Sequence, residues 1–251
     1  MLRWIAILLL FPWAAQSETV VAGLSQNRVS ITANFDGSEI LIFGAVKREA
    51  PDGLDLPIDV IIAVEGPSEP VMVRRKEKWF GIWVNRDAVE VDSAPSFYKV
   101  ATTGRFDEVL SETEDLRHNV SIERAIRRVD APQGIMDAER FTEALIRIRK
   151  RERVYQERPY TVILSERTLF RSSVALPANL TEGNYKVRIF LTREGNVIDA
   201  HETKIYVRKV GLERFLYNLS REQPLLYGIM SLAIAIAAGW LASAVFRYVR
   251  S

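Results

Sequence analysis

The residues that could do chemistry are few and scattered along the chain. It has no cysteine and only two histidines, His118 and His201, which are far apart and lie in different contexts. We therefore expect no disulfide, no cysteine nucleophile and no histidine-based zinc or copper site. No nucleophile elbow, P-loop, dinucleotide-binding glycine pattern or His-Glu-x-x-His string occurs. The sequence predicts no catalytic residue, no metal and no cofactor.

Carboxylates leave one enzymatic alternative open. Asp52, Asp55 and Asp59 lie close together, and paired carboxylates are the machinery of glycoside hydrolysis. Their spacing does not distinguish such a pair from the acidic residues of a solvated loop, which is the interpretation we favour. An enzyme with an unmarked carboxylate site remains an alternative.

A cationic and aromatic segment is the first candidate binding site. Residues 74–83 read Arg-Arg-Lys-Glu-Lys-Trp-Phe-Gly-Ile-Trp, and we expect Trp79 and Trp83 to share one face of a strand. Beside the cations Arg74, Arg75 and Lys76, the indole rings would hold an anionic or carbohydrate ligand through stacking and charge. The alternative is a central strand with both indoles in the core and its charged turn in solvent.

A second basic run lies on a predicted helix with an apolar opposite face. Its members are Arg147, Arg149, Lys150, Arg151 and Arg153. Such a face would suit anionic lipid or an acidic partner. Glutamates are interspersed with these cations, so a solvated helix face is the interpretation that we favour.

Composition limits the partners. The 251 residues carry 34 Lys and Arg against 32 Asp and Glu, a formal net charge of +2, and 48% are hydrophobic. Such a balance gives no bulk attraction to nucleic acid, and we expect no nucleic-acid partner. The hydrophobic content is sufficient for a folded core.

The two ends of the chain are apolar and predict its location. Residues 1–17 have the charge, apolar run and small residues of a signal peptide, with cleavage between Ser17 and Glu18. Residues 224–246 predict a transmembrane helix, because the 22 uncharged residues 225–246 extend about 33 Å. We expect residues 247–251 to form a cytoplasmic tail and the bulk of the chain to be exported, as in a single-pass protein of the bacterial inner membrane with a periplasmic body.

The segments between these ends must position the candidate residues. In the β-rich region 18–103, a period of two predicts a strand at 29–35 that forms a hairpin with 39–46 through Asp36-Gly37. Further strands are expected at 58–64, 71–75, 79–84 and 97–102. In region 104–158, apolar residues at helical spacing, including Tyr155, predict an inserted helical pair.

Strand patterns return in region 159–209. The turn Glu194-Gly195-Asn196 joins its last two strands, and the spacing from Leu180 to Tyr185 is typical of a tyrosine corner. We expect a mainly β protein: immunoglobulin-like β-sandwich domain(s) with the helical insertion and one C-terminal transmembrane helix. One or two β domains fit equally.

Two surfaces at the membrane end are candidates for contact. Residues 210–223 predict an amphipathic juxtamembrane helix, or alternatively the last helix of the soluble body. Within the span, small residues recur every four positions: Ser231, Ala235, Gly239 and Ser243. Such a stripe allows another transmembrane helix to approach closely.

The sequence resembles a family of uncharacterised transmembrane proteins from alphaproteobacteria over nearly its whole length. The resemblance is carried by short strings: Phe43-Gly44-Ala45, Glu65-Gly66-Pro67, Gly81-Ile82-Trp83-Val84-Asn85, Pro95-Ser96-Phe97-Tyr98, Gly183-Asn184-Tyr185 and Leu226-Tyr227-Gly228. It implies an exported domain with one C-terminal span. Because family members are often encoded beside sulfite-exporter-type permeases, it also implies an accessory role in transport. We therefore expect a non-enzymatic accessory or partner of a membrane transport complex. It would contact the lipid bilayer and, through the C-terminal span, another membrane protein such as a sulfite-exporter-type permease. The alternative is a periplasmic binding module.

Overall fold

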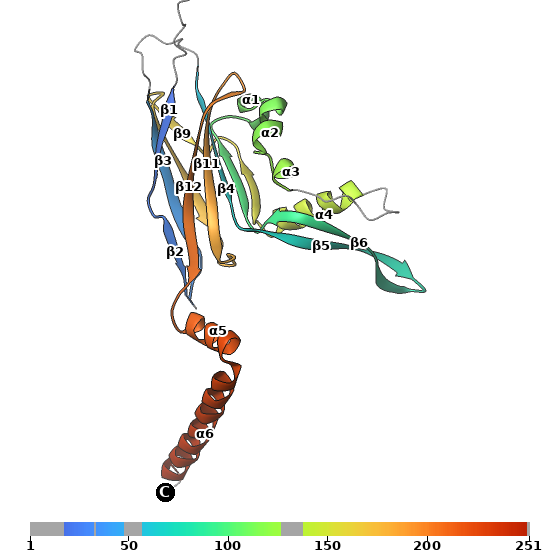
Figure 1. The fold of residues 1–251 in the computed structure, drawn as a ribbon, viewed down its shortest axis with the longest axis vertical. Helices are drawn as coiled ribbons and strands as arrows, with labels where there is room; N and C mark the ends of the chain where they lie inside the picture. Colours follow the sequence, from blue (N-terminus) through green and yellow to red (C-terminus); the bar gives the residue numbers. More distant parts are fainter. Residues whose placement is uncertain (1–17, 33, 48–56, 127–137, 250–251) are drawn as a thin grey trace, which may run out of the picture.

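The computed structural model describes residues 18–249 apart from residue 33, residues 48–56 and residues 127–137. The predicted signal peptide and Ser17 therefore lie outside the described residues, as do Asp52 and Asp55. The described part comprises an elongated β-rich body, a long hairpin that leaves it sideways, and two helices at the C-terminal end (Figure 1).

The body is built from two sheets around one apolar core. The first sheet has the order β1 (Thr19–Leu24), β3 (Ser38–Lys47), β10 (Leu169–Leu176) and β9 (Ile163–Ser165), and all its pairs are antiparallel. Along β10, every second side chain is buried, as expected for a strand with one face on a core and the other in solvent. Ile40 and Phe170 of this sheet belong to the same buried cluster as Ile189 of the second.

The second sheet is larger and is covered on both faces at its centre. Its order is β2 (Arg28–Ile31), β12 (Asn196–Lys209), β11 (Gly183–Arg193), β4 (Asp59–Glu65), β7 (Tyr98–Thr102) and β8 (Tyr155–Arg158). All residues of β7 and the central five of β4 are buried. Such runs occur where a sheet is packed on both sides, and here helices lie over its outer face (Figure 1).

The helical region is more divided than the predicted pair. It contains α1 (Phe106–Val109), α2 (Glu112–His118), α3 (Ile122–Ala125) and the longer α4 (Ala138–Arg151). The side chains of Ser111 and Ser121 accept hydrogen bonds from the first turns of α2 and α3, which explains where these helices begin. The prediction that Tyr155 continues the α4 face is wrong. The helix ends at Arg151, Arg153 has a positive φ of 60°, and Tyr155 begins β8.

The predicted hairpin between 29–35 and 39–46 is also wrong. β2 pairs in parallel with β12 in the second sheet, whereas β3 pairs with β1 and β10 in the first. The segment around Gly37 therefore crosses between sheets and does not close a hairpin. The predicted turn at Glu194-Gly195 and the predicted tyrosine-corner contact are both present. Glu194 and Gly195 both have positive φ in the turn between β11 and β12. The Tyr185 hydroxyl donates to the Thr181 carbonyl over 3.0 Å, the contact expected of a tyrosine corner.

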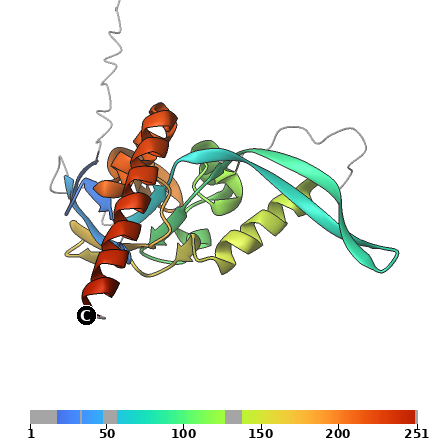
Figure 2. The same ribbon diagram turned by 90° about the horizontal axis from the view of Figure 1, so that it is seen from below.

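The hairpin of β5 (Ser68–Trp79) and β6 (Ile82–Pro95) forms a separate two-stranded ribbon. Val73, Val89 and Val91, in its proximal half, are buried. From Arg74 to Trp79 every side chain is exposed, and the ribbon slopes toward the end of the body from which the C-terminal helices emerge (Figure 1). Figure 2 shows that α4 runs alongside the ribbon and that the tip extends beyond the body.

Two helices complete the chain. The short α5 (Leu212–Glu222) is followed by α6 (Pro224–Val249), which stands clear of the body. Residues Pro224–Ser243 are long and apolar enough to cross a membrane, and none of the residues in this window is buried. The prediction of a mainly β fold with one candidate C-terminal transmembrane helix is confirmed, whereas the immunoglobulin-like topology remains a prediction.

Candidate functional site

The tip of the β5–β6 hairpin is a tight two-residue turn. Phe80 and Gly81 connect the strands with φ values of 46° and 87°. Two successive positive φ values match the right-handed twist of a ribbon, which is why asparagine and glycine dominate such turns. A bulky aromatic residue in the left-handed region costs about 1–2 kcal/mol relative to glycine. The local rule for turn residues is therefore broken at Phe80.

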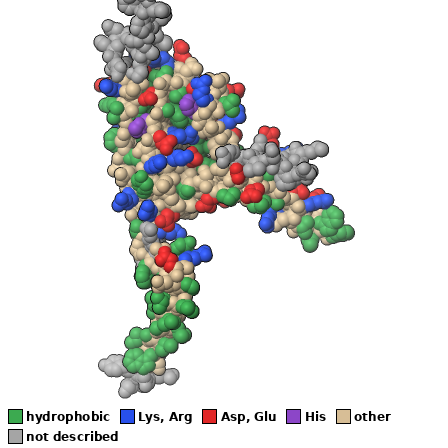
Figure 3. Space-filling view, in the orientation of Figure 1, with side chains coloured by type: hydrophobic (Ala, Val, Ile, Leu, Met, Phe, Trp, Pro, Cys, Tyr) green, Lys and Arg blue, Asp and Glu red, His purple; other side chains and the backbone are tan. Residues whose placement is uncertain are grey.

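Large apolar side chains surround this turn and are exposed. Phe80 is 92% exposed and Trp83 is 68% exposed, while Trp79 and Ile82 are each more than half exposed. Figure 3 shows the hydrophobic side chains gathered at the end of the hairpin, with cationic side chains just behind them. A contiguous apolar patch that the fold does not bury is typical of a contact surface. We call Trp79, Phe80, Ile82 and Trp83 the aromatic tip.

The expectation that Trp79 and Trp83 share one face of one strand is wrong. Trp79 ends β5 opposite Ile82, and Trp83 lies on β6 opposite Lys78. Because directly paired residues share a face and neighbours along a strand alternate, the two indoles lie on opposite faces of the ribbon. The core interpretation of the tryptophans is wrong as well, because both are exposed. The tip is therefore apolar on both sides.

Ion pairs and ring contacts stabilise the distal ribbon. The Arg86 guanidinium lies 5.3 Å from the centre of a Trp79 ring and donates to Glu77 over 3.0 Å. The Trp79 and Phe80 rings meet edge to face at 5.4 Å. Nearer the body, Arg75 forms an ion pair with Asp87. These exposed contacts are individually weak, but together they favour an ordered ribbon.

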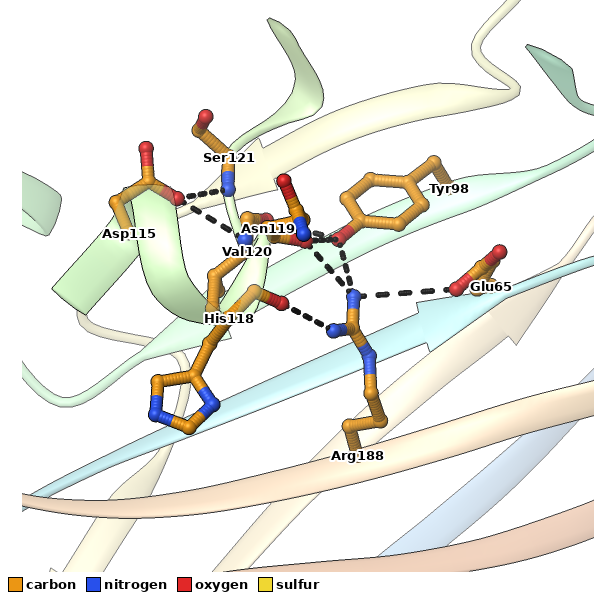
Figure 4. A network of polar contacts seen from close by, with 8 residues as sticks. All are labelled: Glu65, Tyr98, Asp115, His118, Asn119, Val120, Ser121 and Arg188. Carbon is orange, nitrogen blue, oxygen red and sulfur yellow. Dashed lines mark hydrogen bonds and ion pairs between the residues drawn. The ribbon is translucent and has the colours of Figure 1, made fainter. Parts of the chain in front are cut away.

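A second polar site joins the helices to the sheet (Figure 4). Arg188 of β11 donates to the His118 carbonyl over 2.6 Å and to the Asn119 carbonyl over 3.0 Å, so it satisfies the C-terminal end of α2. It also donates to the Tyr98 hydroxyl over 3.0 Å and lies 3.8 Å from Glu65. We call Arg188, Tyr98 and Glu65 the arginine latch.

The latch is largely shielded from solvent. The side chains of Arg188 and Glu65 are each 18% exposed, and the Tyr98 hydroxyl donates to the buried Val120 carbonyl over 2.8 Å. Burial raises the pKa of Tyr98, and the neighbouring Arg188 partly opposes this shift. Nearby, Asp115 accepts from the amides of Val120 and Ser121 and orders the turn into α3.

A pocket of about 1050 Å³ opens beside the latch, between the second sheet, α2, α3 and α4. Its walls carry both acids and bases, including Glu65, Glu123, Glu143, Lys186 and Arg188. The two terminal guanidinium nitrogens of Arg188 bind the end of α2 and Tyr98, while its buried Nε has no hydrogen-bond partner among the described residues. We assign the latch to the docking of α2 and α3 on the sheet. Among the described residues, no three His, Cys, Asp or Glu side chains lie together as metal ligands.

The other sequence-predicted residues fall in separate places. Asp59 accepts from the Thr103 hydroxyl over 2.7 Å at the start of β4. The stripe of α6 is exposed, and a methyl group built on Gly239 would meet nothing within 4 Å. Glu18 accepts from Arg193 over 2.7 Å beside β11. Arg74, Arg75 and Lys76 lie on β5 behind the tip. The Arg75 guanidinium faces Phe141 of α4, and strand alternation turns Arg74 and Lys76 to the other face of the ribbon.

Sequence reasoning missed the latch and the turn at Phe80. Arg188 carried only a weak signal, because it follows Lys186 on the face of β11 opposite Val187 and Ile189, where alternation predicts a solvated cation. The turn at Phe80 carried little signal in the sequence, because Phe-Gly is not one of the dipeptides that mark a tight hairpin.

Together, the β-rich body and the exposed apolar helix α6 define a membrane-anchored protein with a single candidate span. The chain belongs to the family described as "Putative transmembrane protein" (Alph_Pro_TM), which it matches over residues 19–248. The match runs from β1 into α6 and thus includes the body, the hairpin and the span. Comparison with curated proteins gives no match.

Proposed function

We propose that this protein is a non-enzymatic accessory protein that docks on a partner protein in the same membrane through the aromatic tip. The observation that carries the proposal is the exposure of Phe80, Trp83 and their two neighbours at the end of a ribbon that leaves the body. Tryptophan and arginine are enriched at the energetic centres of protein interfaces, and both occur here.

The position of the hairpin supports a lateral partner. It extends beyond the outline of the body, as Figure 2 shows, and so reaches a neighbour that the body itself would not touch. The strained turn supports the same proposal. A sequence selected for stability alone would place asparagine or glycine at position 80, and strain of this kind is concentrated at functional sites.

The small-residue stripe of α6 supplies a second contact in this proposal. Gly239 is open to an approaching helix, and close approach is how transmembrane helices gain packing energy. Gly239→Leu is expected to weaken recovery of the partner in a detergent pull-down. Ala237→Leu is the matched control, because position 237 lies on the opposite side of the helix. Equal effects of the two variants would remove the stripe from the proposal.

Photo-crosslinking tests the docking function directly. We would place p-benzoylphenylalanine at Phe80 in the full-length chain in native membranes, with Tyr160, exposed on the body, as the control position. The expected result is one crosslinked protein from position 80 that is absent from position 160. A sulfite-exporter-type permease is the first candidate to identify. Crosslinks to lipid alone, or none at all, would refute docking on a protein.

The orientation is part of the proposal: a periplasmic body, the inner membrane and a cytoplasmic C-terminus. The chain has no cysteine, so single substitutions report cleanly. In intact spheroplasts, a membrane-impermeant maleimide is expected to label Glu166→Cys in the exposed β9–β10 turn and to leave Ser251→Cys unlabelled until lysis. The reverse pattern would show that the body faces the cytoplasm.

A further inference from the structure

A pocket of about 420 Å³ lies on the outer face of β2 and β12, where the chain leaves the body. It is lined by Arg28 and Ser30 of β2 and by Tyr206, Arg208 and Val210 at the end of β12. The Val210 amide donates to the Ile31 carbonyl over 2.9 Å, and α5 begins two residues later at Leu212. The pocket therefore lies at the end of the body from which the candidate span emerges (Figure 1).

The strand register places the polar residues of this pocket on one face of the sheet. β2 and β12 pair in parallel, with Arg28 beside Tyr206 and Ser30 beside Arg208. The residues that alternate with them are buried, so these four side chains point away from the core: Val29, Ile31, Ile205 and Val207. Arg28 and Arg208 lie diagonally across the strand pair, about 8 Å apart from the usual strand spacing and rise per residue. Two long side chains at this separation can reach one ligand.

The two arginines are not neutralised by the described part of the chain. Neither has an ion-pair partner there. The acids on the adjoining segments, Asp36, Glu182 and Glu202, pair with neither arginine. Lys204 adds a positive charge on the same face of β12. Figure 3 shows Lys and Arg side chains at this end of the body, next to α5.

The candidate span brings lipid headgroups to this end of the body. It begins at Pro224, and a headgroup layer of about 5–7 Å covers each side of the hydrocarbon core. Between the pocket and the span, Phe215 and Tyr217 of α5 are 56% and 60% exposed, so the body does not bury them. An amphipathic helix with exposed aromatic side chains suits the membrane interface, and α5 in that position sets the pocket at headgroup level. Tyr206 is 40% exposed, and tyrosine is enriched at this depth.

We infer that this pocket binds the phosphate group of an anionic phospholipid, with Arg28 and Arg208 donating to the phosphate oxygens. Guanidinium groups form paired, charge-assisted hydrogen bonds with phosphate, and the Ser30 hydroxyl offers one more donor. A headgroup held there fixes the tilt of the body on the bilayer. The inference is independent of docking by the aromatic tip and of which side of the membrane carries the body, because it uses only the pocket and the adjoining span.

A lipid titration of the full-length chain in dodecyl maltoside micelles tests this inference. The chain has no cysteine, so Thr32→Cys, exposed just after β2, carries one bimane fluorophore beside the pocket. Palmitoyl-oleoyl phosphatidylglycerol is the anionic probe, and the matching phosphatidylcholine is its zwitterionic control. The expected result is a saturable change in emission with phosphatidylglycerol and none with phosphatidylcholine. Each arginine near an anionic surface contributes about fivefold, so Arg28→Gln/Arg208→Gln should raise the half-saturating mole fraction about thirtyfold.

The matched control is Arg147→Gln/Arg171→Gln, which removes the same charge from exposed positions of α4 and β10. It should change the half-saturating mole fraction less than twofold. The micelles contain no partner protein, so the result does not depend on the proposed docking function. An equal response to phosphatidylcholine, no response of the wild type, an unchanged mole fraction in the first double variant, or an equal loss in the control would overturn the inference. The same change of emission with inorganic phosphate alone would overturn the assignment to a lipid.

Discussion

Removing the arginine latch is expected to destabilise the body substantially. Arg188→Met keeps most of the apolar stem but removes the donors to the His118 and Asn119 carbonyls and leaves Glu65 without its cation. Breaking a buried ion pair from one side costs about 3–5 kcal/mol. Because both side chains of this pair are 18% exposed, we expect the lower end, about 3 kcal/mol. For a body of this size that corresponds to a decrease in Tm of about 6–12 °C.

Thermal unfolding of the full-length chain in detergent, followed by far-ultraviolet circular dichroism, measures this loss. Hydrogen exchange should show that amides of α2 (Glu112–His118) lose protection first, because the latch holds the end of that helix. Adding Glu65→Gln to Arg188→Met removes the orphaned charge and should restore about 1 kcal/mol. Arg171→Met, at an exposed position of β10, is the control. A decrease in Tm below 2 °C, or no restoration by Glu65→Gln, would refute the reasoning.

Three further predictions concern the turn, a buried tyrosine and a tight strand position. Phe80→Asn should raise the Tm by about 1–4 °C because it relieves the left-handed strain; a lower Tm would contradict the assigned strain. Burial raises the pKa of Tyr155 to about 12, above about 10 in the unfolded chain, so the stability that its neutral hydroxyl supplies is present below pH 10 and lost as the pH rises through 12. Urea unfolding should therefore show the advantage of wild type over Tyr155→Phe, about 1 kcal/mol at pH 8 from the bond to the Pro95 carbonyl, shrinking above pH 10; a constant difference would contradict this. Gly44→Ala should cost about 1–3 kcal/mol in the same assay, because the new methyl group would lie 2.5 Å from the Val21 carbonyl oxygen; a neutral effect would show that β1 and β3 separate easily.

Local patterns predicted the elements better than their partners. The alternation of β10, the Glu194-Gly195 turn and the Tyr185 contact depend on residues close in sequence, and all three are present. The partner of β2 depends on residues that are distant in the sequence, because Val29 pairs with Val207 near the end of the β-rich region. A period of two indicates which side chains face a core, but it does not indicate which strand lies alongside.

The turn of the β5–β6 hairpin was not predicted, for a different reason. The residues around Phe80 have the β-branched and aromatic character of a strand, and that character predicted one continuous strand through Trp79 and Trp83. The turn that interrupts it uses a residue that tight turns disfavour. When a local rule is broken at a residue that is also fully exposed, packing does not compensate for the cost. The departure from the rule thus supports a role outside the fold.

The basic segments show the limit of judging charges one element at a time. Taken alone, residues 74–76 suit a charged turn and Arg147 suits a solvated helix face, and each interpretation is reasonable for an isolated element. The fold brings one of these side chains against α4: the Arg75 guanidinium lies 5.2 Å from the centre of the Phe141 ring, while strand alternation turns Arg74 and Lys76 to the other face of the ribbon. The contact between Arg75 and Phe141 exists only once β5 and α4 pack together, so neither segment alone predicts which of the three cations packs against the helix.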